Sequence, residues 1–249
     1  MVHFVGAGPG ATDLITVRGL RLIKEADVLI YAGSLVSRDF ADFLKPDAEV
    51  YNSARMTLEE VCAVFLRAES DGKNTVRLHT GDPSLYGAIA EQIAFLKGKN
   101  ISYDVTPGVT SALAAAAEMG MEYTLPGVSQ TLIMTRVAGR TPVPSEESIE
   151  ALARTHSSMA VYLSVSKCAE LKTALLKGGY SEDTPAAIAY RVSWPDQKII
   201  RTTVGKLDSC QKEEGIVKTA LVIVGDAVNQ SDFERSCLYD PDFKTEYRR

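Results

Sequence analysis

Short apolar runs and amphipathic helical patterns alternate through the first half of the chain, and this alternation limits the fold more than any other feature. Leu14, Val17, Leu20 and Ile23 recur at spacings of three and indicate an early helix. Repeated strand and helix patterns of this kind form a parallel sheet with helices on both faces. The apolar runs that we interpret as strands occupy residues 3–5, 27–31, 48–51, 75–78 and 103–105.

Several helices in this half carry recognisable start signals. Thr57 and Glu60 are spaced as a capping box, in which the threonine oxygen accepts from the backbone three residues on and the glutamate reaches back. A helix is predicted from there to just before Gly72, with further helices over residues 86–96 and 111–119.

The second half is less regular and indicates a mixed sheet. One helix is expected over residues 169–177. The last two apolar runs stand close together with a short helix between them, which suggests an antiparallel component. The strand candidates are residues 129–135, 159–163, 186–190, 198–204 and 220–224.

Length and composition fit two α/β domains. A chain of 249 residues with 45% hydrophobic residues can bury two cores. We expect the fold class to be α/β, with an N-terminal domain over residues 1–120, a C-terminal mixed domain over 121–228 and a polar, aromatic surface tail over 229–249.

Charge, cysteine and histidine usage argue against several classes of partner. The 27 basic and 32 acidic residues give a net charge of −5, which leaves no electrostatic footprint for nucleic acid. No signal peptide is apparent, and no run approaches the ~18 apolar residues of a membrane-spanning helix. We expect a cytoplasmic protein with reduced thiols and no metal site, since no ligands cluster in sequence. The scattered residues are Cys62, Cys168, Cys210 and Cys237, with His3, His79 and His156.

A glycine-rich segment, Gly6–Ala11 (GAGPGA), follows the first predicted strand. It formally matches the dinucleotide fingerprint, so a nicotinamide-dependent oxidoreductase is one alternative. However, no acidic residue ends the second strand to hold a ribose, and Pro9 lacks the N–H that a phosphate cradle would use. The glycines still indicate a tight turn and a close approach of the backbone to something.

Two further junctions follow strands. In His79–Gly87 (HTGDPSLYG), Asp82 before Pro83 is either a helix cap or a ligand contact, and His79 is a satisfied polar residue or a weak catalytic candidate, as is Asp82. In residues 106–111 (TPGVTS), capping accounts for one hydroxyl and a second could face a ligand. Carboxyl ends of parallel strands bind ligands, so we expect one crevice that holds a small molecule through backbone groups.

Together these motifs resemble the tetrapyrrole (corrin and sirohaem) methyltransferase family, which uses S-adenosyl-L-methionine. The resemblance rests on GAGPG with Leu14-Ile15-Thr16, on GDPSLYG and on PGVTS before an alanine-rich helix, in matching order and spacing. It extends from Phe4 to about Asp226. Ala11 departs from the acidic residue that many members carry there.

Other segments narrow the resemblance to the branch that methylates C11 of precorrin-4 or cobalt-precorrin-4 in cobalamin biosynthesis, giving precorrin-5 or cobalt-precorrin-5. They are YAGSLV (31–36), HTGDPSLYGAI (79–89), LPGVSQTL (125–132), RTPVP (140–144), YRVSWPD (190–196) and the tail over 234–243. The alternatives are a member acting at another ring position or in the sirohaem branch, one that methylates RNA or a protein histidine, and a sensor without turnover.

The resemblance also implies site residues, a homodimer and a cofactor folded into a cleft between the two domains. Arginines pair bidentately with carboxylates such as those on the rim of a tetrapyrrole. The substrate candidates are Arg55, Arg136, Arg140 and Arg191, with Trp194 as either a stacking platform or core filler. The implied cofactor contacts are Pro9, Thr80, Gly81, Asp82, Leu85, Tyr86, Thr110, Ser111, Leu163, Thr219 and Ala220.

Overall fold

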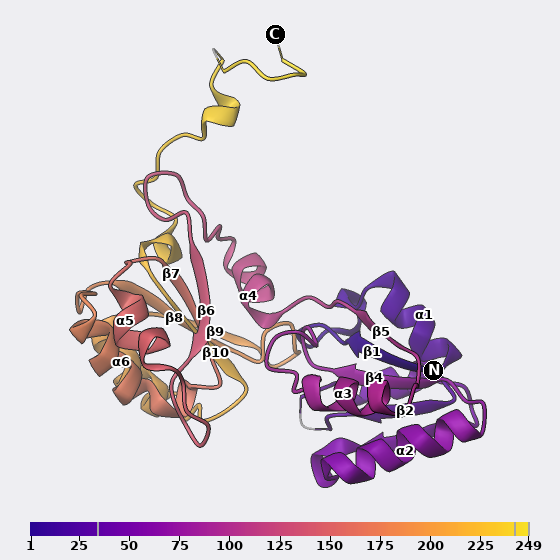
Figure 1. Ribbon diagram of the computed structural model, residues 1–249. Coiled ribbons are helices and arrows are strands. Elements are labelled where there is room, and N and C mark those ends of the chain that lie inside the picture. The colour runs from indigo at the N-terminus through magenta and orange to yellow at the C-terminus, as the bar shows by residue number, and fades with distance from the viewer. Residues whose placement is uncertain (34, 242, 249) are drawn as a thin grey trace. The chain divides into compact units, whose positions relative to one another are not determined.

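A computed structural model describes residues 1–33, 35–241 and 243–248 (Figure 1), so Ser34 of the YAGSLV segment and Asp242 of the tail lie outside the described residues. The chain forms two compact units. Unit 1 comprises Met1–Ala114 and Ser193–Pro195, and unit 2 comprises Ala115–Val192 and Asp196–Arg249.

Unit 1 is built on a five-stranded sheet in the order β3-β2-β4-β1-β5, in which every pair is parallel. This confirms the parallel α/β fold predicted for the first half. The strands are β1 (Val2–Gly6), β2 (Val28–Tyr31), β3 (Glu49–Asn52), β4 (Thr75–His79) and β5 (Tyr103–Thr106). The helices are α1 (Val17–Glu25), α2 (Leu58–Ser70) and α3 (Ala90–Gly98), with 3-10 turns η1 (Thr12–Leu14), η2 (Arg38–Phe43) and η3 (Ser53–Arg55). Helix α4 (Ser111–Met119) begins in unit 1 and continues into unit 2.

Alternate side chains of each strand enter cores on opposite faces of this sheet. Phe4 and Ile30 pack with α2 and α3 on one face. Val5 and Leu78 pack with α1 and η2 on the other face. The predicted helix layers on both faces are therefore confirmed.

Two predicted helices of unit 1 begin later than their patterns suggest. The early helix is divided, because Thr16 is extended and caps α1 by accepting from the Gly19 amide. The helix expected from residue 86 begins only at Ala90, because Tyr86 and Ala88 have left-handed φ angles of 57° and 49°. The capping box at Thr57 and Glu60 is confirmed.

Unit 2 contains a mixed five-stranded sheet in the order β6-β7-β10-β8-β9. Only β6 and β7 are parallel, and β8 pairs antiparallel with both β9 and β10, which confirms the expected antiparallel component. The strands are β6 (Leu132–Arg136), β7 (Ser158–Tyr162), β8 (Pro185–Tyr190), β9 (Lys198–Thr203) and β10 (Ala220–Val224). The helices are α5 (Ile149–Ala153), α6 (Cys168–Lys177) and α7 (Leu207–Glu213), with 3-10 turns η4 (Ser145–Glu147), η5 (Val165–Lys167), η6 (Val204–Lys206), η7 (Asp226–Asn229) and η8 (Cys237–Tyr239).

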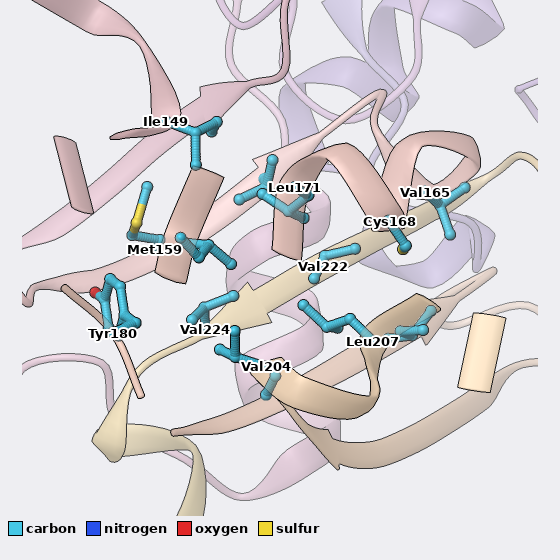
Figure 2. Packing of buried hydrophobic residues seen from close by; sticks show 14 of the residues in the cluster. Ile149, Met159, Val165, Cys168, Leu171, Tyr180, Val204, Leu207, Val222 and Val224 are labelled. Atoms are coloured by element: carbon cyan, nitrogen blue, oxygen red, sulfur yellow. The ribbon is translucent and has the colours of Figure 1, made fainter. Parts of the chain in front are cut away.

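The core of unit 2 lies between one face of this sheet and its three α-helices that follow β6 (Figure 2). Met159 and Val222 from the strands meet Leu171 from α6 and Leu207 from α7. Cys168 is part of this core, and burial raises the pKa of its thiol to about 11. The thiol is therefore packed as a small apolar group.

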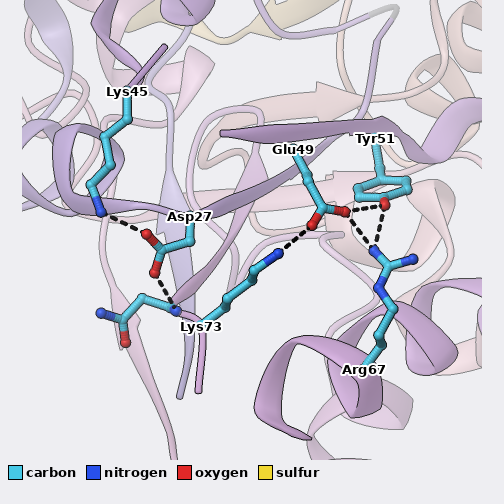
Figure 3. Close-up of polar contacts among 7 residues, drawn as sticks. Asp27, Lys45, Glu49, Tyr51, Arg67 and Lys73 are labelled. Carbon is cyan, nitrogen blue, oxygen red and sulfur yellow. Dashed lines mark hydrogen bonds and ion pairs between the residues drawn. The ribbon is translucent and has the colours of Figure 1, made fainter. Parts of the chain in front are cut away.

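An ionic network lies at the amino ends of β2, β3 and β4, whereas the glycine loops follow the carboxyl ends of the strands. Figure 3 shows its side chains. Glu49 accepts from Lys73 (2.6 Å) and Arg67 (2.7 Å) and from the Tyr51 hydroxyl (2.6 Å). These bonds lower the pKa of Glu49 to about 2, the Lys73 bond most. Asp27 accepts from Lys45 in the same region.

The C-terminal tail is exposed along most of its described length. The Glu234 amide donates to the Pro126 carbonyl (3.0 Å), which anchors its start. Beyond that bond, the side chains of Tyr239 and Tyr247 are largely exposed. Among the described residues, no helix is long and apolar enough to cross a membrane.

Candidate functional site

The three junctions singled out in the sequence meet at the carboxyl ends of β4, β1 and β5, which are neighbours in the sheet of unit 1. The Ala7 amide donates to the His79 carbonyl (2.7 Å). Gly8 and Gly81 form an antiparallel bridge, in which the Gly81 amide donates to the Gly8 carbonyl at 2.8 Å. The loops after β1 and β4 are thus joined through their backbones.

Glycine is required where these loops cross, because there is no space for side chains. A Cβ on Gly108 would lie 2.1 Å from the Gly81 carbonyl oxygen and 2.8 Å from the Gly6 Cα. A Cβ on Gly6 would lie 2.6 Å from the Gly108 Cα. The sequence predicts that the first glycine loop brings the backbone close to something. At Gly6, that neighbour is the backbone of the other two loops, at Gly81 and Gly108.

The Asp82 carboxylate holds two of the loops together. Its Oδ1 accepts from the Ser84 amide (2.8 Å) and its Oδ2 from the Gly108 amide (2.9 Å). No helix begins at Pro83, since α3 starts at Ala90 with Ile89 at its N-cap. The helix-cap interpretation of Asp82 is therefore wrong, and its carboxylate instead links the loop after β4 to the loop after β5.

The His79 side chain is packed inside unit 1. It is 5% exposed and its ring centroid lies 6.0 Å from that of Phe4. Burial, with a contribution from the charge of Arg77, lowers the pKa of His79 to about 3. Its Nε2 has no hydrogen-bond partner within the described parts of the chain. His79 is therefore a neutral, buried ring at neutral pH.

Arg77, which is 8% exposed, lies on the same face of the sheet and is also buried. Its Nε donates to Gln92 Oε1 (3.2 Å) and an Nη to the Ile30 carbonyl (3.3 Å). Burial lowers its pKa to about 10, so the guanidinium stays charged at neutral pH. These two hydrogen bonds connect β4 to α3 and to β2.

Other predicted cofactor contacts surround this crossing. Thr80, Gly81 and Leu85 lie in the loop after β4, where Tyr86 has a left-handed backbone and a side chain that is 45% exposed. Thr110 and Ser111 lie at the start of α4 and are half-buried. Left-handed φ angles in residues other than glycine cost energy and gather at functional sites, which makes Tyr86 a candidate on backbone grounds alone.

The first glycine loop is held by a segment from the second half of the sequence. The Trp194 Nε1 donates to the Pro9 carbonyl (3.1 Å), and the Ala11 amide donates to Ser193 Oγ (3.0 Å). The sequence reasoning did not pair these segments, because 185 positions separate Pro9 from Trp194. The one available signal is that the chain has a single tryptophan, placed in the distinctive YRVSWPD segment.

The predicted contacts of unit 2 gather at one end of its sheet. The register pairs Val222 with Val161 and Ala220 with Tyr190, which brings the residues after β7 and β8 to the start of β10. Leu163 and Thr219 both have left-handed φ angles, of 53° and 56°. Leu163 is also 70% exposed, and left-handed backbone in residues other than glycine gathers at functional sites, so Leu163 and Thr219 stay candidates.

The candidate arginines differ in their partners. Within the described residues, neither Arg55 nor Arg140 has an ion-pair partner, and both are exposed. Arg191 pairs with Asp196 at 2.6 Å. Arg136 donates to the Thr141 and Pro142 carbonyls, so it organises its own loop. In the described part of the chain, no group of three or more His, Cys, Asp or Glu side chains is placed to hold a metal ion.

Comparisons with known proteins agree with this arrangement. The family model for tetrapyrrole (corrin/porphyrin) methylases matches residues 1–208. A cobalt-precorrin-4 C(11)-methyltransferase of Methanocaldococcus jannaschii is 50% identical over 248 residues, covering 100% of this chain and 96% of that protein. The X-ray structure of a cobalt precorrin-4 methyltransferase, a cobalamin biosynthetic enzyme, has a TM-score of 0.89 and 46% identity, covering 91% of this chain and 95% of the other. The uroporphyrin-III C-methyltransferase of Thermus thermophilus, complexed with S-adenosylhomocysteine, has a TM-score of 0.77 and 28% identity, covering 92% of this chain and 99% of the other.

Proposed function

The chain belongs to the tetrapyrrole (corrin/porphyrin) methylase family, and we propose that it transfers a methyl group from S-adenosyl-L-methionine to C11 of precorrin-4 or cobalt-precorrin-4. The products are precorrin-5 or cobalt-precorrin-5, intermediates of cobalamin biosynthesis. The resemblance of YAGSLV, RTPVP and YRVSWPD to the C11 branch supports this acceptor, as does similarity along the whole chain to a relative of that name.

The observation that carries the proposal is the crossing of Gly6, Gly81 and Gly108 at the carboxyl ends of neighbouring parallel strands. This edge of a parallel sheet is where α/β folds bind ligands. In this proposal, backbone N–H and C=O groups of these loops bind the adenosyl and amino acid parts of the ligand. Binding through backbone groups also explains why a site for S-adenosyl-L-methionine, a charged molecule, needs few charged side chains.

S-adenosyl-L-methionine, when bound, supplies the activated methyl group, and the loops of unit 1 fit it through Pro9, Thr80–Asp82, Leu85, Tyr86, Thr110 and Ser111. The Pro9 carbonyl accepts one bond from Trp194 and has a second lone pair for another donor. In unit 2, the proposed contacts are Leu163, Thr219 and Ala220. Most are backbone contacts, so truncating these side chains has small effects.

The proposed contacts to the substrate carboxylates are Arg55, Arg140 and Arg191. Arg55 and Arg140 are exposed cations, and Arg191 is oriented by Asp196. Bidentate pairing with a carboxylate gives both energy and orientation. Against the net charge of −5, such local cations determine where a polyanionic macrocycle docks.

Catalysis in this proposal comes from positioning. Holding two reactants in line supplies on the order of 7–11 kcal/mol in the best cases. The acceptor carbon is already electron-rich through the conjugated ring nitrogen, so it needs little activation. Both Asp82 oxygens bind backbone amides and His79 is a buried neutral ring, which favours structural roles for these two residues over general-base catalysis.

We further propose that the protein acts as a homodimer in the cytoplasm, as its resemblance to the family implies. The four cysteines are free, and Cys62 and Cys168 are buried, which fits a reducing compartment. Light scattering coupled to size-exclusion chromatography measures the mass directly, and a mass near twice 27.0 kDa is expected.

The deciding experiment supplies methyl-labelled donor with precorrin-4 or cobalt-precorrin-4. Mass spectrometry should show the addition of one methyl group, and NMR should place it on C11. Methylation at another carbon would move the chain to a different branch of the family. If isothermal titration detects no binding of S-adenosylhomocysteine, the proposed function is refuted.

A further inference from the structure

The segment Ser193–Pro195 belongs to unit 1, although the chain on both sides of it belongs to unit 2. It lies within the connection between β8 and β9. Arg191 and Ser193 both have left-handed φ angles, of 45° and 63°. Strained backbone at two of three successive residues persists only where surrounding contacts stabilise it. Contacts at these residues are therefore expected to stabilise the connection between β8 and β9.

The stabilising contacts are with the first glycine loop. Trp194 Nε1 bonds the carbonyl of Pro9, and Ser193 Oγ bonds the amide of Ala11. The two bonds engage the residues on either side of Gly10. A Cβ on Gly10 would lie 2.3 Å from Trp194 Cδ1 and 2.4 Å from its Nε1, so the indole packs directly on the glycine.

The backbone bonds from the loop to the rest of the sheet edge lie at its start, where Ala7 and Gly8 bond the end of β4 and the loop after it, so Pro9–Ala11 depend on other contacts. The η1 turn that follows spans three residues and has no side-chain cap. Pro9 contributes no backbone donor. The Gly8–Gly81 bridge supports the loop on one side, and the Ser193–Trp194 pair supports the side after Gly8.

We infer that Trp194 is a positioning residue for the methyl-donor site: its N–H and the Ser193 hydroxyl set the conformation of Pro9–Ala11 in which the loop binds S-adenosyl-L-methionine. The inference rests on the proposed function, because it assigns Trp194 to the donor site rather than to stacking on the macrocycle. A hydrogen bond of this kind is worth roughly 1 kcal/mol, so its loss should weaken donor binding by roughly 3- to 10-fold.

The first test is isothermal titration with S-adenosylhomocysteine. Trp194→Phe removes the donor and keeps an aromatic ring, and Ser193→Ala removes the acceptor for Ala11. Each should weaken binding 3- to 10-fold relative to wild type. Ser70→Ala, at an exposed position of α2 in the same unit, is the matched control and should bind as wild type does.

Two readouts distinguish positioning from a general loss of structure. The KM for the methyl donor should rise in Trp194→Phe while the KM for the tetrapyrrole stays the same. A stacking role, which the Phe ring preserves, predicts little change in the donor KM in Trp194→Phe and a higher tetrapyrrole KM in Trp194→Ala. Gly10→Ala should weaken binding by collision with the indole. Adding Gly10→Ala to Trp194→Ala should cause a smaller loss than Gly10→Ala alone, because the ring is gone and the nearest remaining atom is Ser193 Oγ, at 3.0 Å.

The fluorescence of the wild-type protein provides an independent measurement, since Trp194 is the sole tryptophan. S-adenosylhomocysteine should change its emission, with Trp194→Phe as the blank. If wild type binds S-adenosylhomocysteine but Trp194→Phe binds it equally well, the inference is overturned and the proposed function stands. If wild type itself does not bind, the proposed function fails first.

Discussion

Gly108→Ala tests whether the crossing of the three loops is as tight as the structure shows. The added methyl would lie 2.1 Å from the Gly81 oxygen and 2.8 and 2.9 Å from Gly6 backbone atoms, whereas ordinary contacts lie at 3.4–4 Å. The overlap therefore exceeds 1 Å on one side. The obstructing atoms are backbone at the ends of β1 and β4, so no side-chain rotation relieves the collision.

The magnitude follows from this geometry. Overpacking costs typically 1–3 kcal/mol, and a collision with two backbones belongs at the upper end, about 3 kcal/mol. With a urea m-value of about 2 kcal/mol/M, the unfolding midpoint should fall by roughly 1.5 M. S-adenosylhomocysteine binding should weaken by at least roughly 10-fold, because loop displacements of this size disrupt backbone contacts.

Urea titration followed by Trp194 fluorescence is the appropriate assay, because the only tryptophan belongs to unit 1. Gly98→Ala is the matched control: Gly98 ends α3 in the same unit, and a Cβ there meets nothing within 4 Å. It should be neutral or stabilising by up to ~1 kcal/mol. An unchanged midpoint and unchanged affinity in Gly108→Ala would refute the tight crossing.

Four further predictions follow from the described contacts. Asp82→Asn should destabilise unit 1 by roughly 1–3 kcal/mol, because the amide nitrogen cannot accept from a backbone N–H; urea titration measures it. His79 has a pKa of 6.5 in the unfolded chain and about 3 in the folded chain, so between these pH values only the unfolded chain binds the proton. The free energy of unfolding should therefore fall with falling pH by up to about 1.4 kcal/mol per pH unit, and His79→Gln should remove that part of the slope. Glu49, with its pKa lowered from 4.5 to about 2, stabilises the fold above pH 4.5 and loses this effect as the pH falls to 2; the difference in stability between wild type and Glu49→Gln should shrink over that window. Arg140→Ala should raise the KM for the tetrapyrrole severalfold and leave the affinity for S-adenosylhomocysteine unchanged.

Specific outcomes contradict each of these predictions. Equal stability of Asp82→Asn and wild type contradicts the linking role of the carboxylate. A pH slope that survives in His79→Gln assigns the titration to another group. If Glu49→Gln is as much less stable than wild type at pH 2 as at pH 4.5, the charge of Glu49 is not the cause of the difference. An unchanged KM for the tetrapyrrole in Arg140→Ala removes this arginine from the substrate site.

The sequence predicts those elements whose signal is local. Residues 220–224 form an uninterrupted apolar run and are the bounds of β10 in the structure. The capping box at Thr57 depends on residues three positions apart and is present as predicted. The three glycine junctions were also recognisable, because strand ends and glycines are adjacent in the chain.

The features that sequence reasoning missed depend on distant parts of the chain. The start of α3 was misplaced because Tyr86 and Ala88 adopt left-handed backbones that no helix propensity describes. The helix cap, one of two interpretations of Asp82, is wrong because no helix begins at Pro83, and the partner that its carboxylate binds instead, the Gly108 amide, is 26 residues away. The glycines of the first loop predict a close approach of the backbone without saying to what, and at Gly6 the neighbour is the loop that contains Gly108, about 100 positions later in the chain.

The position of Trp194 also has a consequence for synthesis. Unit 1 includes Ser193–Pro195, so it is not a contiguous stretch of chain. Pro9 can form its bond with Trp194 only after another 185 residues have been synthesised. At translation rates of 5–20 residues per second, that delay is roughly 10–40 s. The nascent N-terminal half therefore leaves the ribosome with its sheet complete and Gly8 bridged to Gly81, but without the Ser193 and Trp194 contacts to Pro9–Ala11, which form only after most of unit 2 has been synthesised.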